Sequence, residues 1–115
     1  MQLASLIICV VLAIAHIGAG SAKLVKAPAA VAQVRAGGVR SDRALVVLGV
    51  LELAAAVGLV VGLWFTPVGI AAALGSVLYF VGALVGHIRE RNNQVQGAVA
   101  LLLLSIAALV TLLLR

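Results

Sequence analysis

The stretch ALVVLGVLELAAAVGLVVGL, residues 44–63, is apolar throughout except for one carboxylate, Glu52. In an α-helix these residues cover about 30 Å, the thickness of the hydrocarbon core of a bilayer. Similar runs occupy residues 3–22, 67–86 and 97–114. Since a segment in lipid must satisfy its own backbone hydrogen bonds, all of these runs are predicted to be helices. The predicted fold class is an all-α membrane protein, a four-helix bundle formed by a single domain over residues 1–115.

The composition excludes a soluble globular domain. Of the 115 residues, 65% are hydrophobic and 10% are charged, against about 45–50% and about 25% in soluble domains. The net charge of +5 is spread over short segments between the apolar runs, so we expect membrane lipid and not nucleic acid as the partner. The single cysteine, Cys9, excludes a disulfide or CxxC pair within one chain.

The basic residues predict the orientation in the membrane. Residues 23–43 and 87–96 together carry seven of the eight Lys and Arg residues, and Arg115 is the eighth. By the positive-inside rule both basic loops are cytoplasmic and both termini lie outside. We therefore expect a multi-pass protein of the bacterial plasma membrane.

The segments that flank the spans carry capping signals. Pro28 and Gly37-Gly38 bound a short helix within the inner loop, predicted to lie along the membrane interface as a lid or as a connector. Ser41-Asp42 offers N-capping oxygens to the second span, and Thr66 caps the third, with Pro67 at its first helical position.

Each predicted span carries one polar side chain near the same depth. Counted from the cytoplasmic ends at about 1.5 Å per residue, Glu52 and His16 lie roughly 9 to 12 Å into the membrane. Tyr79 and Ser105 fall at a similar depth in the third and fourth spans. A carboxylate at this depth costs about 2.5–3.5 kcal/mol on insertion scales, so Glu52 must face the bundle interior and find a partner.

The partner of Glu52 is predicted to be His16, with Tyr79 as a further hydroxyl donor. These residues bind a ligand or carry a proton, or they form a structural network that fixes helix packing. Lys23 lies on the same stripe of the first span as His16 and either guards the entrance to the Glu52 site or anchors the helix at the interface. His87 ends the third span, where a protonated imidazole complements the helix dipole.

Small residues are expected to pack the helices against one another within the chain. Gly58-x-x-x-Gly62 and Gly82-x-x-x-Gly86 are small-xxx-small pairs, which let backbones approach closely in lipid. Oligomeric state does not follow from them.

The sequence contains no catalytic triad, phosphate-binding loop or dinucleotide motif, and its two histidines and few carboxylates match no three- or four-ligand metal site. We assign no catalytic and no metal-binding residue, no intrinsic cofactor, and no catalytic activity to the chain alone.

Six short segments resemble a known family in their order and spacing. Gly20-Ser21-Ala22-Lys23-Leu24 resembles a G-x-x-K-L pattern at the end of a first helix, and LGVLEL at residues 48–53 resembles an L-G-x-x-E-L pattern in a second. Pro67-Val68-Gly69 with Ala72-Ala73 resembles the start of a third helix, and Gly82-Ala83 followed by His87-Ile88-Arg89 resembles its end. Together they resemble the DoxX-like family of small four-helix membrane proteins.

The resemblance implies that Lys23, Glu52, His87 and Arg89 stand at the family's recurrent polar positions. Some relatives are described as membrane subunits of oxidoreductase assemblies, including thiosulfate to quinone oxidoreduction. Partner oxidoreductase subunits and a bound quinone or lipid are therefore expected, and a redox cofactor would belong to a partner.

Three functions are compatible with the polar layer. The first is a membrane subunit or binding bundle for a quinone or lipid-like molecule, held by Glu52, His16, Tyr79 and Lys23, with weaker roles for His87, Arg89 and Ser105. The second is a proton-coupled four-helix transporter, disfavoured by the position of Glu52 in the second span, by aromatic residues at 3% and by the strong charge bias. The third is a structural assembly factor.

Overall fold

The computed structural model describes residues 2–93 and 95–115, and within them it contains five α-helices and no strand. These are α1 (Gln2–Leu24), α2 (Pro28–Ala36), α3 (Asp42–Val61), α4 (Thr66–Arg89) and α5 (Gln96–Leu113). All except α2 are long and apolar enough to cross a membrane. The predicted four-helix membrane fold is confirmed, and α2 is the short helix predicted after Pro28.

The helix ends agree with one of the two predicted caps. Ser41 is the N-cap of α3, and its Oγ accepts a hydrogen bond from the backbone nitrogen of Ala44 at 3.0 Å. The cap predicted at Thr66 is wrong, because α4 begins at Thr66 itself and its N-cap is Phe65, which makes no side-chain hydrogen bond. Pro67 is the second helical residue and not the first, a position whose N–H also has no acceptor within the helix.

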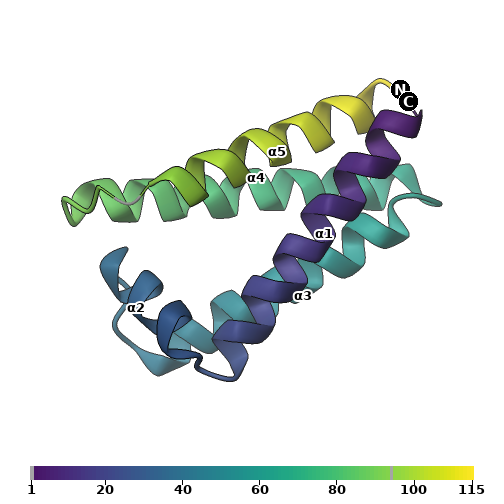
Figure 1. The fold of residues 1–115 in the computed structure, drawn as a ribbon. Helices are drawn as coiled ribbons and strands as arrows, with labels where there is room; N and C mark the ends of the chain where they lie inside the picture. The colour runs from purple at the N-terminus through teal and green to yellow at the C-terminus, as the bar shows by residue number, and fades with distance from the viewer. Residues whose placement is uncertain (1, 94) are drawn as a thin grey trace.

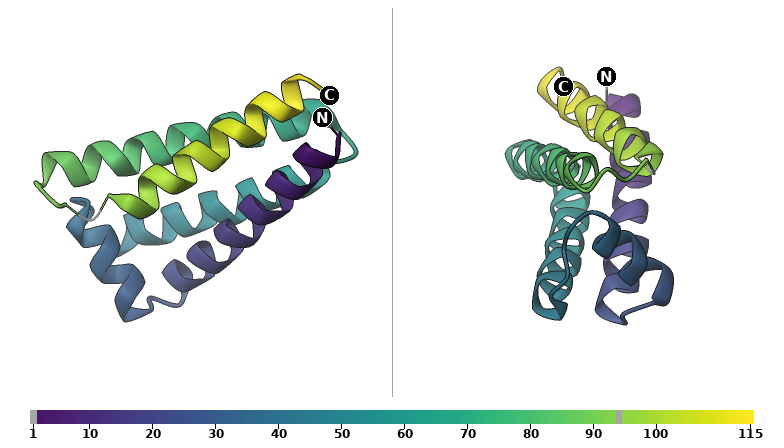
Figure 2. Two further views of the ribbon diagram at one scale, coloured as in Figure 1. Left: turned by 45° about the horizontal axis from the view of Figure 1, so that its top comes forward. Right: turned by 90° about the vertical axis from the view of Figure 1, so that its left-hand side faces the viewer.

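The four long helices form two pairs that diverge. α1 packs along α3 and α4 packs along α5, and the pairs meet through contacts of α3 with α4 and of α1 with α5. Figure 1 shows the pairs close together where both termini lie and apart at the other end, where α2 is placed. Figure 2 shows α2 lying across that open end. Which end faces the cytoplasm stays a prediction.

Glycine contacts hold together the end of the bundle where both termini lie, called the closed end below. A Cβ atom at Gly58 would lie 2.8 Å from the Cβ of Ala72, and one at Gly62 would overlap the backbone of Gly69. α3 and α4 therefore touch almost backbone to backbone at this end, as predicted for the Gly58 and Gly62 pair. At the other end the close approach lies within one pair, since a Cβ at Gly20 of α1 would be 2.9 Å from the carbonyl oxygen of Gly49 in α3.

The predicted Gly82–Gly86 packing face is only half correct. Gly86 packs tightly against the Gly37 carbonyl at the end of α2. Around Gly82, however, a Cβ would meet no atom within 4 Å among the described residues, its own helix backbone apart. Gly82 faces open space and not another helix.

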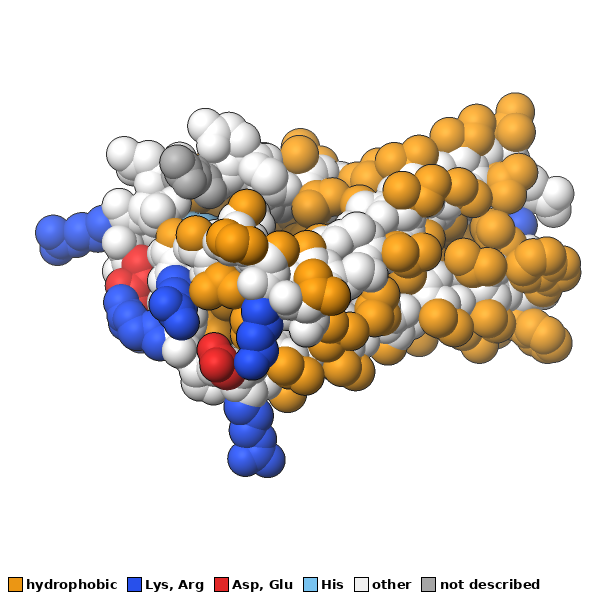
Figure 3. Space-filling model, turned by 60° about the horizontal axis from the view of Figure 1, so that its bottom comes forward, with side chains coloured by type: hydrophobic (Ala, Val, Ile, Leu, Met, Phe, Trp, Pro, Cys, Tyr) orange, Lys and Arg blue, Asp and Glu red, His pale blue; other side chains and the backbone are white. Residues whose placement is uncertain are grey.

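The surface has the distribution expected of a membrane protein. Apolar side chains cover most of its length, and Lys and Arg side chains gather at the end that carries α2 (Figure 3). Inside, buried apolar residues form the core: Cys9, Leu12, Ala13, Ala56, Leu59, Ala73, Phe80, Ala108 and Leu112.

Candidate functional site

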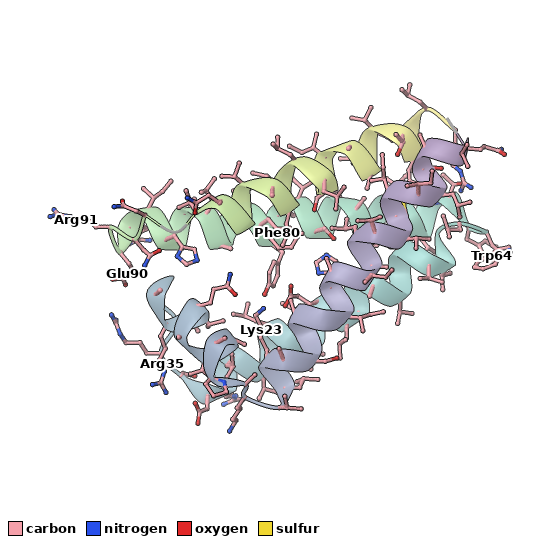
Figure 4. The ribbon with its side chains drawn as sticks, in the orientation of Figure 1. Lys23, Arg35, Trp64, Phe80, Glu90 and Arg91 are labelled. Carbon is pink, nitrogen blue, oxygen red and sulfur yellow. The ribbon has the colours of Figure 1, made fainter. Side chains whose placement is uncertain are left out.

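A buried ion pair joins α1 to α3. Lys23 Nζ donates to Glu52 Oε2 at 2.6 Å, and the two side chains are 9% and 2% exposed. Lys23 lies in the last turn of α1 and Glu52 in the middle of α3, and the close approach of Gly20 to Gly49 brings these helices within reach. Lys23 therefore turns inward onto the carboxylate instead of extending to the interface, and Figure 4 shows it in the space between the helix pairs.

His16 connects this pair to α4. Its Nδ1 lies 3.4 Å from Glu52 Oε1 and its Nε2 lies 2.9 Å from Ser76 Oγ. Ser76 donates its own proton to the carbonyl of Ala72 at 3.0 Å, so its oxygen is free to accept from Nε2–H of His16. With the proton assigned to Nε2 in this way, Nδ1 and the carboxylate oxygen face each other as acceptors, and one added proton between them would complete a hydrogen bond.

Two aromatic rings of α4 complete the cluster. Phe80 stacks on His16 with ring centroids 5.3 Å apart and planes inclined by 22°. Tyr79 meets the same imidazole edge to face at 6.3 Å, and its hydroxyl interacts with the Glu52 carboxylate. The ring of Phe80 points from α4 toward α1 and α3 in Figure 4. We call these residues, His16, Lys23, Glu52, Ser76, Tyr79 and Phe80, the Glu52 cluster.

The Glu52 cluster borders a cavity of about 880 Å³. Every member of the cluster contributes to the cavity wall. The wall follows α4 from Val68 to His87 and α3 from Leu48 to Gly58, and it includes residues of α2 and α5. Pockets that hold small molecules are about 300–1,000 Å³ and combine mostly apolar walls with a few convergent polar groups. The cluster supplies such polar groups, and most of the remaining wall is Ala, Gly, Leu and Val.

The structure brings together four of the predicted site residues: His16, Lys23, Glu52 and Tyr79. Ser105 is buried elsewhere and donates to the carbonyl of Leu101 in its own helix at 2.7 Å. Arg89 is exposed at the end of α4 and does not line the cavity. The polar side chains that meet therefore come from α1, α3 and α4, and Ser105 of α5 does not join them.

Sequence reasoning missed Ser76 and Phe80. Ser76 lies three residues before Tyr79 and four before Phe80, so helical periodicity places all three near one face. Ser76 could have been identified from the sequence, because it is a polar residue within an apolar run. Phe80 could not, because a single phenylalanine in a transmembrane segment does not differ from a lipid-facing or core residue.

His87 occupies the far end of the cavity. Its side chain is buried, with the residue 6% exposed, although it belongs to the last turn of α4. It lies beneath the end of α2, where a Cβ on Gly37 would be 3.5 Å from its Nε2. Among the described residues nothing forms a hydrogen bond with its Nδ1. The ring is thus enclosed by protein, and the helix-dipole role predicted for it does not account for this burial.

A family comparison agrees with this structure. The family model described as the DoxX-like family matches residues 7–110, which include all of the Glu52 cluster. No curated protein and no solved structure matches the chain significantly.

Proposed function

We propose that the chain, which belongs to the DoxX-like family, binds a lipid-soluble small molecule whose polar head hydrogen-bonds to the Glu52 cluster. A quinone is the head group that this chemistry fits best. The observation that carries the proposal is the position of a buried Lys23–Glu52 ion pair on the wall of a cavity of about 880 Å³. Buried ionisable groups are costly in a membrane and commonly mark functional sites.

The cluster offers both kinds of hydrogen-bonding partner. Lys23 and the Tyr79 hydroxyl are donors, and the Glu52 carboxylate is an acceptor. The carbonyl oxygens of a quinone need donors, whereas the hydroxyl groups of a quinol also need an acceptor. A single site with this composition therefore suits both oxidation states, and the rings of Tyr79 and Phe80 provide apolar faces for a flat head group.

The redox part of the proposal assigns electron transfer to a partner. The sequence contains no motif for a redox cofactor, so the chain would hold the quinone while partner oxidoreductase subunits supply or remove electrons. Proton movement, in contrast, is within the capacity of the chain, because His16 Nδ1 and Glu52 Oε1 lie 3.4 Å apart. We place the cavity near the cytoplasmic side, following the charge bias of the loops.

Native mass spectrometry of the protein extracted from its own membrane in mild detergent tests the proposal. Glu52→Gln keeps the size of the side chain and removes its charge. The control is Asp42→Asn, which neutralises an exposed carboxylate at the start of α3, away from the cavity wall. We expect one small-molecule adduct on the wild type and on Asp42→Asn and its loss from Glu52→Gln. A wild type without any adduct, or an adduct retained by Glu52→Gln, contradicts the proposal.

Proton-coupled transport is the second candidate, and the facing His16 and Glu52 acceptors favour it. Its signature is proton release when a transported compound binds. If purified protein releases protons on addition of a lipophilic cation, and Glu52→Gln abolishes that release, the transport function replaces the binding function. A structural assembly role is supported instead if Glu52→Gln and His16→Ala unfold the protein without any effect on a ligand or partner.

A further inference from the structure

Two glycines on the cavity wall have no packing role. At Gly75 and Gly82 of α4 a Cβ atom would meet nothing within 4 Å in the described part of the chain, their own helix backbone apart, and both residues line the cavity. This separates them from Gly58, Gly62 and Gly69, which are packed too closely for any side chain. A glycine inside a helix is less favourable than alanine, so helix formation does not explain Gly75 and Gly82. Their effect is to leave room beside α4.

The room beside α4 opens sideways toward the hydrocarbon region. Gly75 lies about 14 Å along the helix from Thr66, near the middle of the span. Exposed apolar residues of α3 and α4 stand on the same wall: Leu51, Ala54, Val68, Ala71 and Leu78. In a bilayer these side chains face lipid tails, so a molecule dissolved in the membrane can reach the cavity between α3 and α4 without crossing water.

The end of the cavity near α2 is obstructed. The Gly37 carbonyl packs against Gly86, and Glu90 fills the space at Gly38, where a Cβ would be 2.8 Å from its Oε1. An ion pair of 3.8 Å joins Arg40 to Glu90 across the same contact. α2 is therefore fastened to the end of α4, which leaves the lateral opening as the direct route.

Polarity differs between the two directions along α4. Toward α2 the wall includes Gln33 and the buried His87 among apolar residues such as Val34 and Ala83, and the described residues offer no hydrogen-bond partner for Nδ1 of His87. Toward the closed end of the bundle the wall consists of Gly75, Ala71 and Val68 on α4, facing Ala55 and Gly58 on α3. An apolar chain attached to a head at Glu52 meets only apolar wall in the second direction, whereas in the first it would cover the polar groups of Gln33 and His87.

We infer that the ligand of the Glu52 cluster carries one hydrocarbon chain, which lies along α4 over Gly75 toward Val68, and that the ligand exchanges laterally with the bilayer. This inference rests on the proposed function and adds the class of ligand, a single-chain amphipath, and its direction of binding. The buried His87 marks the polar end of the same cavity.

Leucine substitutions at three open glycines test the inference. Gly75→Leu fills the proposed chain path, and Gly82→Leu fills the cavity on the other side of Tyr79. Gly18→Leu is the matched control, because Gly18 of α1 also has nothing within 4 Å of a Cβ in the described structure but does not line the cavity. Leucine favours helix more than glycine does, so all three variants should fold, which circular dichroism verifies.

Each variant is titrated with two probes in phosphatidylcholine nanodiscs. One is a benzoquinone with a decyl chain, and the other is the same benzoquinone with a methyl group in place of the chain. We expect Gly75→Leu to weaken binding of the decyl probe by at least about tenfold, because overpacking a filled site costs this much or more. Binding of the methyl probe to Gly75→Leu should change less than about twofold. Gly82→Leu should change both probes by similar factors, and Gly18→Leu should change neither.

The outcomes separate the inference from the proposed function. If Gly75→Leu affects both probes equally or neither, or if Gly82→Leu is the variant that selects against the decyl probe, the chain does not lie over Gly75 and the inference is wrong. If methyl-probe binding depends on Glu52 in those cases, the proposed function still stands. If neither probe binds the wild type, or if both bind Glu52→Gln unchanged, the quinone-type function and the inference both fail.

Discussion

Removing the cation from the buried ion pair should destabilise the protein far more than removing the anion. In Lys23→Met the Glu52 carboxylate keeps its burial, with a side chain 2% exposed, but loses the ammonium that lies 2.6 Å away. Taking one partner from a buried pair costs about 3–5 kcal/mol, and an unpaired carboxylate at this membrane depth costs about 2.5–3.5 kcal/mol. His16 offers some compensation, since it can hold a proton against Glu52 Oε1. We therefore expect the free energy of unfolding of Lys23→Met to be about 3 kcal/mol lower than that of the wild type.

Glu52→Gln should lower the free energy of unfolding by about 1 kcal/mol, the net contribution of one hydrogen bond. The asymmetry follows from geometry, because Lys23 stands in the last turn of α1 and its long side chain can swing to the interface when the carboxylate is gone. Glu52 is held in the middle of α3 and has no such escape. The double variant Lys23→Met/Glu52→Gln buries no charge and should lie within about 1 kcal/mol of the wild type.

Equilibrium unfolding in mixed micelles, followed by circular dichroism, measures these differences. The control is Lys26→Met, which removes an exposed partner of Asp42 at 3.6 Å and should change stability by less than about 1 kcal/mol. If Lys23→Met is no less stable than Lys26→Met, or if the double variant is as unstable as Lys23→Met, then Glu52 is solvated through the cavity and the argument from desolvation is refuted.

Three further predictions concern the fold. Gly62→Ala should destabilise the protein by about 1–3 kcal/mol, because its Cβ would overlap the backbone of Gly69, while Gly18→Ala should stabilise it by up to about 1 kcal/mol; equal unfolding curves for the two would contradict the packing at the closed end. Ser41→Ala removes the N-cap hydrogen bond to Ala44 and should cost about 1 kcal/mol in the same unfolding assay, whereas Thr66→Val, at a position that does not cap α4, should cost less. To test the orientation, Phe65→Cys and Asn93→Cys are made in a Cys9→Ser background and treated with a membrane-impermeant maleimide. We expect the reagent to label Phe65→Cys in intact cells and Asn93→Cys only after permeabilisation. The reverse pattern would show that the predicted topology is inverted.

The spans could be predicted well from the sequence because a transmembrane helix depends only on the residues that follow one another along the chain, and not on tertiary contacts. A run of about twenty apolar residues must be a helix in lipid whatever surrounds it, so each predicted span differs from the observed helix by no more than three residues at either end. Depth also depends only on position along the chain, and counting residues placed His16, Glu52 and Tyr79 near one level. Depth does not give the direction in which a side chain points. Ser105 has a suitable depth but bonds to its own helix, while Ser76 and Phe80 point inward and contact His16.

Which side chains contact each other across helices was harder to predict, because such contacts depend on how closely the helices approach. Lys23 was expected near the interface, about two turns of α1 from His16, and a flexible four-carbon stem could have pointed either way. It reaches Glu52 because Gly20 and Gly49 let α1 and α3 touch. The same reasoning applies to His87, whose burial depends on Gly37, just after α2, and Gly86 of α4, which lie about fifty residues apart in the sequence.

The arrangement of small residues also explains why the cavity lies where it does. At the closed end Gly58, Gly62 and Gly69 bring α3 and α4 together, so the two helix pairs meet there and the cavity continues only as the outer groove lined by the exposed Val68 and Ala71. Toward the other end the close contact of Gly20 with Gly49 stays inside the α1 and α3 pair, and comparable small residues of α4, Gly75 and Gly82, have no helix against them. The pairs must therefore diverge, and the polar side chains of α1, α3 and α4 face the resulting space. Small residues thus act in two opposite ways here: where two of them oppose each other they join helices, and where they stand unopposed on α4, at Gly75 and Gly82, they form part of the cavity wall.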